Sequence, residues 1–380
     1  MTFNFTEEQL MCQELARELS QKEFKPRAHE FDETAQFPKE NIEKLAEAGL
    51  MGLNISEEYG GAGLDEISKV LAIKEVARAC SNTSEMYAVH LLVNNIIEVN
   101  GTEEQKKKYL PMACEGKLGA FALTEPNAGS DASGLLTKAV EDGEYYVING
   151  TKCFISNMGP EEGDFVVLIA LTEPSKGTKG MTAFLIDRDT PGFSVGKTEN
   201  KMGMRAAAVS ELILDNVRVH KSAILGKLGD GFKIAMAGLD GGRVGIAAQA
   251  CGVAEAALEK AVEYSGQRIQ FGKPINANQG IQWYIADMAT RLEASKLLAL
   301  EAAAARDAKD PESSKLCAMA KYYASESAVW ICNKALQIHG GYGYMKEYDI
   351  ERLYRDVRII TLYEGTSEVQ KMVISRAVLK

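Results

Sequence analysis

The chain has 380 residues, 46% of them hydrophobic and 25% charged, which excludes an intrinsically disordered chain, a collagen and a disulfide scaffold. A chain of this length holds two or three domain-sized units. Its formal net charge of −10 disfavours broad nucleic-acid binding, because such binding needs a basic face. No apolar run approaches the ~20 residues of a spanning helix, so we expect a soluble globular protein without a membrane span.

Cysteine and histidine usage narrows the class further. The seven cysteines are scattered and form no C-x-x-C pair, as in a reduced intracellular protein. The N-terminal segment becomes acidic almost at once, unlike a signal or transit peptide, so we expect a cytoplasmic location. The four histidines are far apart and show no metal-ligand spacing, and no metal site is expected.

Residues 1–118 have the pattern of a helical domain. Thr6, followed by acidic residues, predicts one helix start, and Pro38 predicts a second helix. Thr102 and Gln105 form the Thr-x-x-Gln pattern of a capping box, which predicts another helix.

Residues 119–228 change to a period of two, which predicts a β-domain. Asn149-Gly150 between two apolar runs predicts a hairpin turn, because both turn positions require positive φ. Further strands are predicted at 165–171, 181–186 and 210–219.

Residues 229–380 return to helix. Alanine-rich segments at 246–261, 281–305 and 313–338 predict a four-helix bundle with short connections. The predicted fold class is therefore mainly α with a β insert.

No G-x-G-x-x-G or P-loop is present, so any dinucleotide must be held by a fold other than these. Residues 122–131 stand at the change from helix to strand. They form either a polar loop that caps the next element or a site whose Thr124, Gly129 and Ser130 offer hydroxyl and N–H groups to a flavin edge or a phosphate.

Two later segments have similar double interpretations. The glycines of 340–343 either cap a long helix or let the backbone approach a ligand closely. Ser367 and Gln370 predict a capping box, which places Glu364 in a tight loop before a helix. Glu364 then either complements the helix dipole or acts as a general base whose pKa is raised by burial and lowered by the dipole.

Taken together, these segments resemble the acyl-CoA dehydrogenases, from about residue 3 to the end of the chain. Residues 122–125 with 129–131 match one family signature, and residues 363–366 match the segment around the family's catalytic base. A second signature matches at Gln337, Gly340, Gly341, Gly343, Tyr344, Glu347, Arg352 and Asp356. The resemblance implies a helical N-terminal domain, a β-barrel-like middle domain and a C-terminal four-helix bundle, assembled as a homotetramer (a dimer of dimers) with one FAD per subunit.

The resemblance also implies the chemistry. Glu364 matches the base that removes the α-proton of an acyl-CoA thioester while the β-hydrogen leaves as hydride to FAD. Residues matched to FAD contacts are Phe121, Leu123, Thr124, Gly129, Ser130, Phe154, Ser156, Arg268, Phe271, Gln279, Gln337, Gly341, Thr366 and Glu368. Arg268, Phe271, Gln279, Gln337 and Gly341 should meet the FAD of the neighbouring subunit. Residues matched to substrate contacts are Ser130, Asp240, Arg243, Tyr363 and Gly365.

Three positions depart from many relatives: Phe154 where Trp is common, Ser156 for Thr and Glu368 for Gln. Phe154 and the Leu-Asp-Gly-Gly-Arg run at 239–243 most resemble short-chain, butyryl-CoA-type enzymes of anaerobic bacteria, which exchange electrons with an electron-transferring flavoprotein. Three alternatives stay open: a reductase of acryloyl-CoA or of an aryl-acryloyl-CoA such as caffeoyl-CoA that draws on NADH through that partner, an acyl-CoA oxidase, and a scaffold without chemistry. The acyl group and the physiological direction also stay open.

Overall fold

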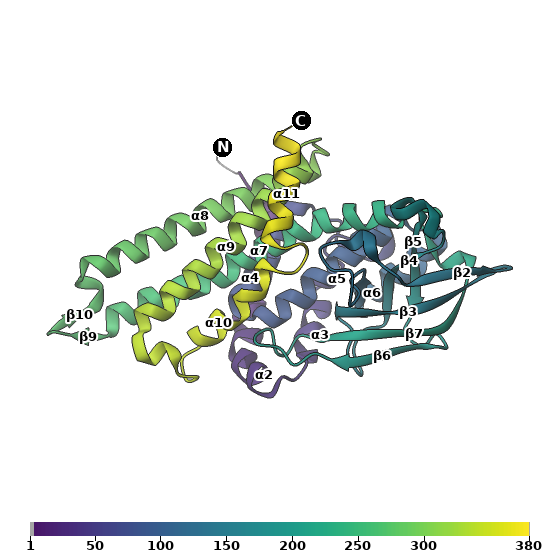
Figure 1. Cartoon of the computed structure of the whole chain (residues 1–380). Helices are drawn as coiled ribbons and strands as arrows, with labels where there is room; N and C mark the ends of the chain where they lie inside the picture. The colour runs from purple at the N-terminus through teal and green to yellow at the C-terminus, as the bar shows by residue number, and fades with distance from the viewer. Residues whose placement is uncertain (1–3, 380) are drawn as a thin grey trace.

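Helices, a sheet and a second set of helices follow one another along the chain in the computed structural model, which describes residues 4–379 (Figure 1). The sheet occupies one end of an elongated molecule, and the longest helices extend toward the other end. This order confirms the predicted fold class, a mainly α protein with a β insert.

The N-terminal helices follow the capping signals of the sequence. They are α1 Glu7–Leu19, α2 Ala28–Thr34, α3 Lys39–Glu47, α4 Glu66–Ala79, α5 Ser81–Asn100 and α6 Glu103–Cys114. Thr6 and Thr102 cap α1 and α6 as predicted, and each forms a capping box with the glutamine three residues later. Pro38 is the N-cap of α3, whereas α2, which has no side-chain cap, is not predicted by the sequence pattern.

The middle sheet has the strand order β6-β7-β3-β2-β4-β5-β8, with β1 paired in parallel to β4. The strands are β1 Gly119–Ala122, β2 Lys138–Asp142, β3 Tyr145–Ser156, β4 Phe165–Leu171, β5 Met181–Asp187, β6 Phe193–Thr198, β7 Val209–His220 and β8 Ile224–Leu225. The predicted strands at 165–171, 181–186 and 210–219 are confirmed as β4, β5 and β7.

The predicted hairpin turn at Asn149-Gly150 is wrong. β3 runs through both residues, and the turn between β2 and β3 lies instead at Gly143, whose φ is +60°. Gly150 marks a register shift between β3 and β7. A Cβ at Gly150 would lie 2.4 Å from Oγ1 of Thr137, so the glycine permits a close backbone approach at a bulge.

Strand β4 is buried on both faces and fixes the sheet against the helices. Phe165 and Val167 join a cluster with side chains of α5 and α6. The alternate residues Val166 and Leu168 join a second cluster with side chains of β3 and β7. The sheet therefore has a rigid attachment to the N-terminal helices behind the loop at 122–131.

The C-terminal helices are α7 Gly231–Gln267, α8 Gln279–Asp307, α9 Ser313–His339, α10 Ile350–Val357 and α11 Ser367–Val378, with a hairpin of β9 Ile269–Gln270 and β10 Lys273–Pro274 between α7 and α8. α7, α8 and α9 lie lengthwise against one another, and α10 and α11 pack on α9. α7 has 37 residues and starts well before the predicted segment 246–261. Its early glycines weaken the helix signal, but they allow close packing: a Cβ at Gly238 would lie 2.5 Å from Cδ1 of Ile96.

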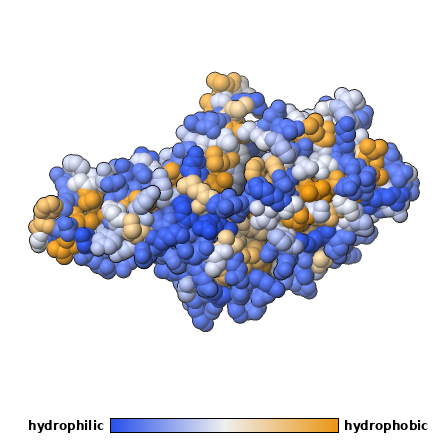
Figure 2. Space-filling view, turned by 60° about the horizontal axis from the view of Figure 1, so that its bottom comes forward, coloured by the Kyte–Doolittle hydropathy of each residue, from blue (hydrophilic) through white to orange (hydrophobic). Residues whose placement is uncertain are grey.

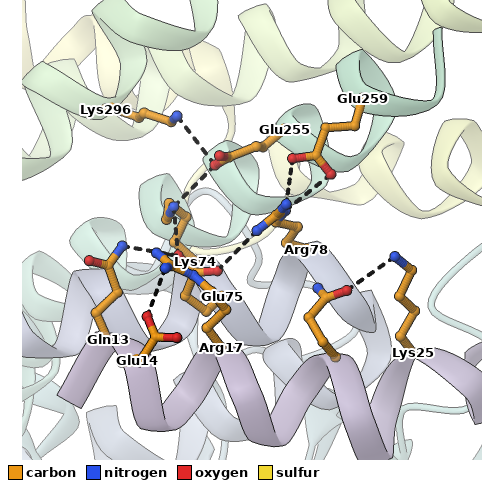
Figure 3. A network of polar contacts seen from close by, with 11 residues as sticks. Gln13, Glu14, Arg17, Lys25, Lys74, Glu75, Arg78, Glu255, Glu259 and Lys296 are labelled. Atoms are coloured by element: carbon orange, nitrogen blue, oxygen red, sulfur yellow. Dashed lines mark hydrogen bonds and ion pairs between the residues drawn. The ribbon is translucent and has the colours of Figure 1, made fainter. Parts of the chain in front are cut away.

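A network of charged side chains joins the two helical domains (Figure 3). The fully buried Glu75 of α4 lies 3.2 Å from Nη2 of Arg17 on α1 and 2.9 Å from Nζ of Lys74. Lys74 also lies 3.1 Å from Glu255 of α7, which in turn lies 3.3 Å from Lys296 of α8. These contacts hold α1 and α4 in register with the C-terminal helices.

Within residues 4–379, no helix combines the length and apolar character needed to cross a membrane. The same residues contain no group of three or more His, Cys, Asp or Glu side chains arranged to hold a metal ion. All seven cysteines are free thiols, and all except Cys114 are buried.

Candidate active site

Glu364 lies in the short loop between the 3₁₀ turn Arg358–Thr361 and α11. The predicted capping box of Ser367 and Gln370 is wrong, because α11 has Thr366 as its N-cap, with the Thr366 side chain accepting a hydrogen bond from the Val369 N–H. Ser367 is already the first helical residue. Nε2 of Gln370 instead donates to the carbonyl oxygens of Glu364 and Gly365, at 3.1 and 2.9 Å.

The backbone of this loop is left-handed at two successive residues. Glu364 has φ of +50° and Gly365 has φ of +90°. Glycine adopts this conformation freely, whereas a residue with a Cβ loses roughly 1–2 kcal/mol there. Strain of this kind persists where the surroundings enforce it, and it is concentrated at functional sites.

Glu364 is half-buried, with one carboxyl oxygen directed into the protein interior. Its Oε2 atom is buried, and no group of residues 4–379 hydrogen-bonds to it. A Cβ at Gly242 on α7 would lie 2.1 Å from this oxygen and 2.5 Å from Cδ1 of Leu92 on α5. The carboxyl group thus occupies space that only a glycine on α7 leaves open.

Burial raises the pKa of Glu364 to about 7. The positive charges of Lys321 on α9, Arg243 on α7 and Lys69 on α4 act in the opposite direction, and the negative charge of Glu85 on α5 adds to the rise. The burial contribution expected from the sequence is therefore present. A carboxyl group with this pKa changes protonation state near neutral pH.

Two predicted substrate-binding residues, Arg243 and Asp240, form an ion pair on α7. Nη1 of Arg243 lies 2.5 Å from Oδ1 of Asp240, which also accepts a hydrogen bond from Oγ of Ser314 at 3.2 Å. Arg243 is buried, and its charge acts on both Glu364 and Lys321. The structure brings Arg243 into the cluster around Glu364, whereas Ser130 lies on an exposed loop next to the sheet.

Tyr363 connects the loop to α5 and α7. Its hydroxyl group donates to Oε1 of Gln249, and Nε2 of Gln249 donates to Oγ of Ser84 at 3.0 Å. Burial raises the pKa of Tyr363 well above its ordinary value, so the phenol stays neutral. The residue before Glu364 is thereby fixed to the two helices that flank the carboxyl group.

The loop at 122–131 is organised by a buried ion pair. Nζ of Lys152 on β3 lies 2.8 Å from Oε1 of Glu125 and donates to the Leu123 carbonyl oxygen at 3.0 Å. Glu125 also accepts hydrogen bonds from the N–H groups of Leu136 and Thr137. The Cys153 N–H donates to the Thr124 carbonyl oxygen at 3.0 Å, which brings Thr124 alongside β3. Glu125 thus has a structural role. It fixes the position of Leu123 and Thr124 where the 122–131 loop meets the end of β3, which we call the corner of the sheet.

The same corner holds Phe154 and Ser156. Phe154 has φ of +58° at a register shift in β3, and its side chain is 64% exposed. Oγ of Ser156 donates to Oε1 of Glu85 at 2.9 Å, and burial raises the pKa of Glu85 to about 7. Of the other residues predicted here, Phe121 is half-buried at the end of β1, Leu123 is buried and Gly129 is exposed.

The remaining predicted FAD contacts lie elsewhere. Arg268, Phe271, Gln279, Gln337 and Gly341 gather where α7 and α9 end and α8 begins, around the β9–β10 hairpin at the left tip in Figure 1. α7 is about 55 Å long from its residue count, so this tip is far from Phe154 within one chain. Phe271 is 98% exposed, and hydrophobic atoms gather at the tip in Figure 2. Thr366 and Glu368 stand at the start of α11, next to Glu364.

Sequence models of three acyl-CoA dehydrogenase domains match almost the whole chain. The N-terminal domain matches residues 6–117, the middle domain 120–217 and the C-terminal domain 229–379. The chain belongs to the acyl-CoA dehydrogenase family. Enzymes of this family are oxidoreductases that act on the CH–CH bond of acyl-CoA thioesters.

Individual relatives are similar over their full length. The chain is 51% identical to an acryloyl-CoA reductase (NADH) of Anaerotignum propionicum, over 100% of this chain and 96% of the relative. It is 47% identical to the caffeyl-CoA reductase–Etf complex subunit CarC of Acetobacterium woodii, over 99% of each. The butyryl-CoA dehydrogenase structure from Megasphaera elsdenii superimposes with a TM-score of 0.97 at 44% identity, covering 100% of both chains.

Several residues of this acyl-CoA dehydrogenase site are not predicted from the sequence. Lys321 and Gln370 contact the Glu364 loop, Gly242 makes room for its carboxyl group, and Glu85 binds Ser156. The sequence offers one signal for such residues, namely a charged side chain within an otherwise apolar helical segment. This signal applies to Lys321 and Glu85, which are both buried.

Proposed function

We propose that this acyl-CoA dehydrogenase interconverts a short-chain acyl-CoA and its trans-2-enoyl-CoA, with FAD as cofactor and an electron-transferring flavoprotein as electron partner. The observation that carries the proposal is the Glu364 carboxyl group, which has a buried oxygen without a hydrogen-bond partner in residues 4–379 and a pKa raised to about 7 by burial. A general base is most effective when its pKa lies near the working pH, because it is then ionised and still basic.

The reaction requires a base for the α-proton, an acceptor for the β-hydride and hydrogen bonds to the thioester oxygen. Glu364 takes the α-proton of the thioester and becomes a carboxylic acid, while the β-hydrogen leaves with its electron pair. FAD, when bound, supplies the acceptor for that hydride. The α-carbon is a weak acid, so the developing enolate needs hydrogen bonds to the thioester oxygen, for which we propose the Glu364 backbone N–H as one donor.

The corner of the sheet fits a flavin. Phe154 is exposed and held at a bulge with positive φ, and Thr124 is fixed beside it by the Cys153 hydrogen bond. Ser156 adds a second hydroxyl group from the same strand. An aromatic face with two hydroxyl groups on a rigid support suits a planar ring whose edge carries hydrogen-bonding atoms.

The distant tip supports assembly with a second copy. Arg268 and Phe271 are too far from Phe154 to share its flavin within one chain, yet Phe271 is almost fully exposed. We propose that they meet the FAD of a neighbouring subunit in a homotetramer. Because the flavin would then lie between subunits, cofactor binding and assembly would stabilise each other.

The acyl group would lie along one face of α5. Leu92, Ala88 and Glu85 follow one another on this face at helical spacing. Leu92 lies beside Gly242, Ala88 would be 3.7 Å from a Cβ at Gly245, and Glu85 binds Ser156. α5 and α7 approach closely along this line, which supports a short acyl group.

The second candidate is reduction of acryloyl-CoA or of an aryl-acryloyl-CoA such as caffeoyl-CoA, with electrons drawn from NADH through the flavoprotein partner. It is favoured by the similarity to the acryloyl-CoA reductase and to the caffeyl-CoA reductase–Etf complex subunit. Both candidates use the same base and the same hydride path, in opposite directions. They differ in the acyl group that the pocket must hold and in the source of the electrons.

The test uses the purified holoenzyme. Under anaerobic conditions, we expect the flavin spectrum to bleach on addition of butyryl-CoA. A Glu364→Gln variant should keep its flavin but bleach more slowly, by a factor on the order of 10³ or more. Near wild-type bleaching by this variant would remove Glu364 as the base. Bleaching by propionyl-CoA or an aryl-propionyl-CoA, but not butyryl-CoA, would favour the second candidate, and rapid reoxidation in air would indicate an oxidase.

A further inference from the structure

Lys321 of α9 is fully buried and contacts the loop that carries Glu364. Its Nζ donates a hydrogen bond of 2.7 Å to the Gly365 carbonyl oxygen. A lysine side chain is almost never fully buried unless it is paired, so its position on an otherwise alanine-rich helix calls for a function.

α9 contacts both the loop and the first residue of α11. Lys321 binds the Gly365 carbonyl, and Glu326 accepts a hydrogen bond from Oγ of Ser367 at 2.5 Å. Gln370 of α11 binds the Gly365 carbonyl as well, at 2.9 Å. These bonds point the carbonyl oxygens of the loop toward the protein interior and offset the left-handed conformation of Glu364.

We propose that Lys321 is a positioning residue for the proposed reaction: its ammonium group anchors the Glu364–Gly365 loop and is the principal counter-charge of the Glu364 carboxylate. This inference rests on the proposed function, because it gives Lys321 meaning only if Glu364 is the base.

The electrostatics agree with that geometry. Burial lowers the pKa of Lys321 to about 8, and the charge of Glu364 acts most strongly in the opposite direction. Among the charges that act on Glu364, Lys321 has the largest effect. The other charged groups facing the pair are Arg243 on α7, Lys69 on α4, Glu85 on α5, Glu326 on α9 and Glu368 on α11.

Three substitutions separate the two parts of this role. Lys321→Met removes the charge and the hydrogen bond, Lys321→Gln removes the charge but keeps a donor, and Lys321→Arg keeps the charge. Lys315→Met is the control, since Lys315 lies on the same helix and pairs with Glu312 away from the loop.

The measurement is the rate of flavin bleaching by butyryl-CoA in single turnovers from pH 6 to 10, with flavin content and melting temperature as checks on folding. The rate should rise with pH as Glu364 ionises, since a raised pKa leaves the base protonated at low pH. In Lys321→Met this rise should move up by at least one pH unit, which lowers the rate at pH 7 by about fivefold or more.

Lys321→Gln should show the same shift with a higher plateau rate than Lys321→Met, because the Gly365 carbonyl keeps a partner. Lys321→Arg and Lys315→Met should keep the wild-type pH profile. A wild-type profile in Lys321→Met, or in Lys321→Gln if the methionine variant does not fold, would overturn the proposal. If Glu364→Gln still bleaches at the wild-type rate, the base assignment fails instead, so the two failures are distinct.

Discussion

Gly242 of α7 and Glu364 are packed so closely that a Cβ at Gly242 would lie 2.1 Å from the Oε2 atom of Glu364. Real Cβ atoms essentially never approach another atom to this distance. The Glu364 side chain can therefore occupy its position only because residue 242 has no side chain. The Leu92 side chain on α5 closes the same space from the other side.

We therefore expect Gly242→Ala to displace the Glu364 carboxyl group. The added methyl group cannot be accommodated without moving either the base or Leu92, and a displacement of about 1 Å can cost 10²-fold in rate. Flavin bleaching in single turnovers measures the loss, with flavin content as a check. Gly266→Ala, on the same helix but far from Glu364 and with its nearest contact, Nδ2 of Asn276, at 3.5 Å, is the matched control. Equal rates in the two variants would contradict the packing.

Glu75 should matter for stability and not for chemistry. Burial raises the pKa of Glu75, but the charge of Lys74 and the hydrogen bonds from Arg17, Lys74 and Gln13 outweigh this effect and lower the pKa to about 2. Because the folded pKa lies below the unfolded value of ~4.3, the stabilisation is complete above that value and is lost as the pH falls toward 2. It amounts to about 3 kcal/mol.

The corresponding substitution is Glu75→Gln, which leaves Arg17 and Lys74 without their buried partner and should lower the melting temperature at pH 7. Glu14→Gln is the control: Glu14 also pairs with Arg17, at 2.8 Å, but is exposed, so its loss should change stability by less than about 1 kcal/mol. The difference in melting temperature between wild type and Glu75→Gln should be smaller at pH 3 than at pH 7, and an equal difference at both pH values would count against the assigned pKa.

Arg268→Ala should reduce both flavin retention and tetramer content. We propose that this side chain reaches the cofactor of a neighbouring subunit. In the structure its guanidinium group lies 5.4 Å from the centre of the Tyr342 ring at the exposed tip. Size-exclusion chromatography and the flavin-to-protein ratio provide the measurements. A variant that stays tetrameric and fully flavinylated would remove Arg268 from the interface.

The electron partner can be tested by omission. The chain contains no G-x-G-x-x-G, so we expect little NADH-dependent reduction of crotonyl-CoA by the purified enzyme and a sharp rise when an electron-transferring flavoprotein is added. Omitting the acyl substrate provides the background rate. Substantial NADH turnover without the second protein would exclude this path.

Local signals predicted the parts of the fold that local interactions determine. The capping boxes at Thr6 and Thr102 and the apolar run at 165–171 were confirmed, because each depends on residues within a few positions. Asn149-Gly150 was misread because the conformational freedom that suits a turn also suits a bulge, and only the approach of Thr137 decides between them. The helix cap at Thr366 instead of Ser367 is an error of one residue, because the side chains of two adjacent hydroxyl residues can both serve as a cap.

The site divides in the same way. The proposed roles of Glu364 and of the Phe154 corner come from the resemblance to family signatures. Lys321, Glu85 and Gly242 instead act through contacts between elements that lie far apart in the sequence. A lysine in an alanine-rich helix looks like a solvated residue until its burial is known. Long-range packing leaves little trace in a single sequence.

The separation between the β9–β10 tip and the Phe154 corner has a genetic consequence. If each flavin is held by the corner of one subunit and the tip of another, a chain defective only at Glu364 still carries an intact tip, and a chain defective only at Arg268 still carries an intact base. Two alleles, each inactive alone, would then restore part of the activity when expressed together, because mixed assemblies contain some sites built from the two sound halves.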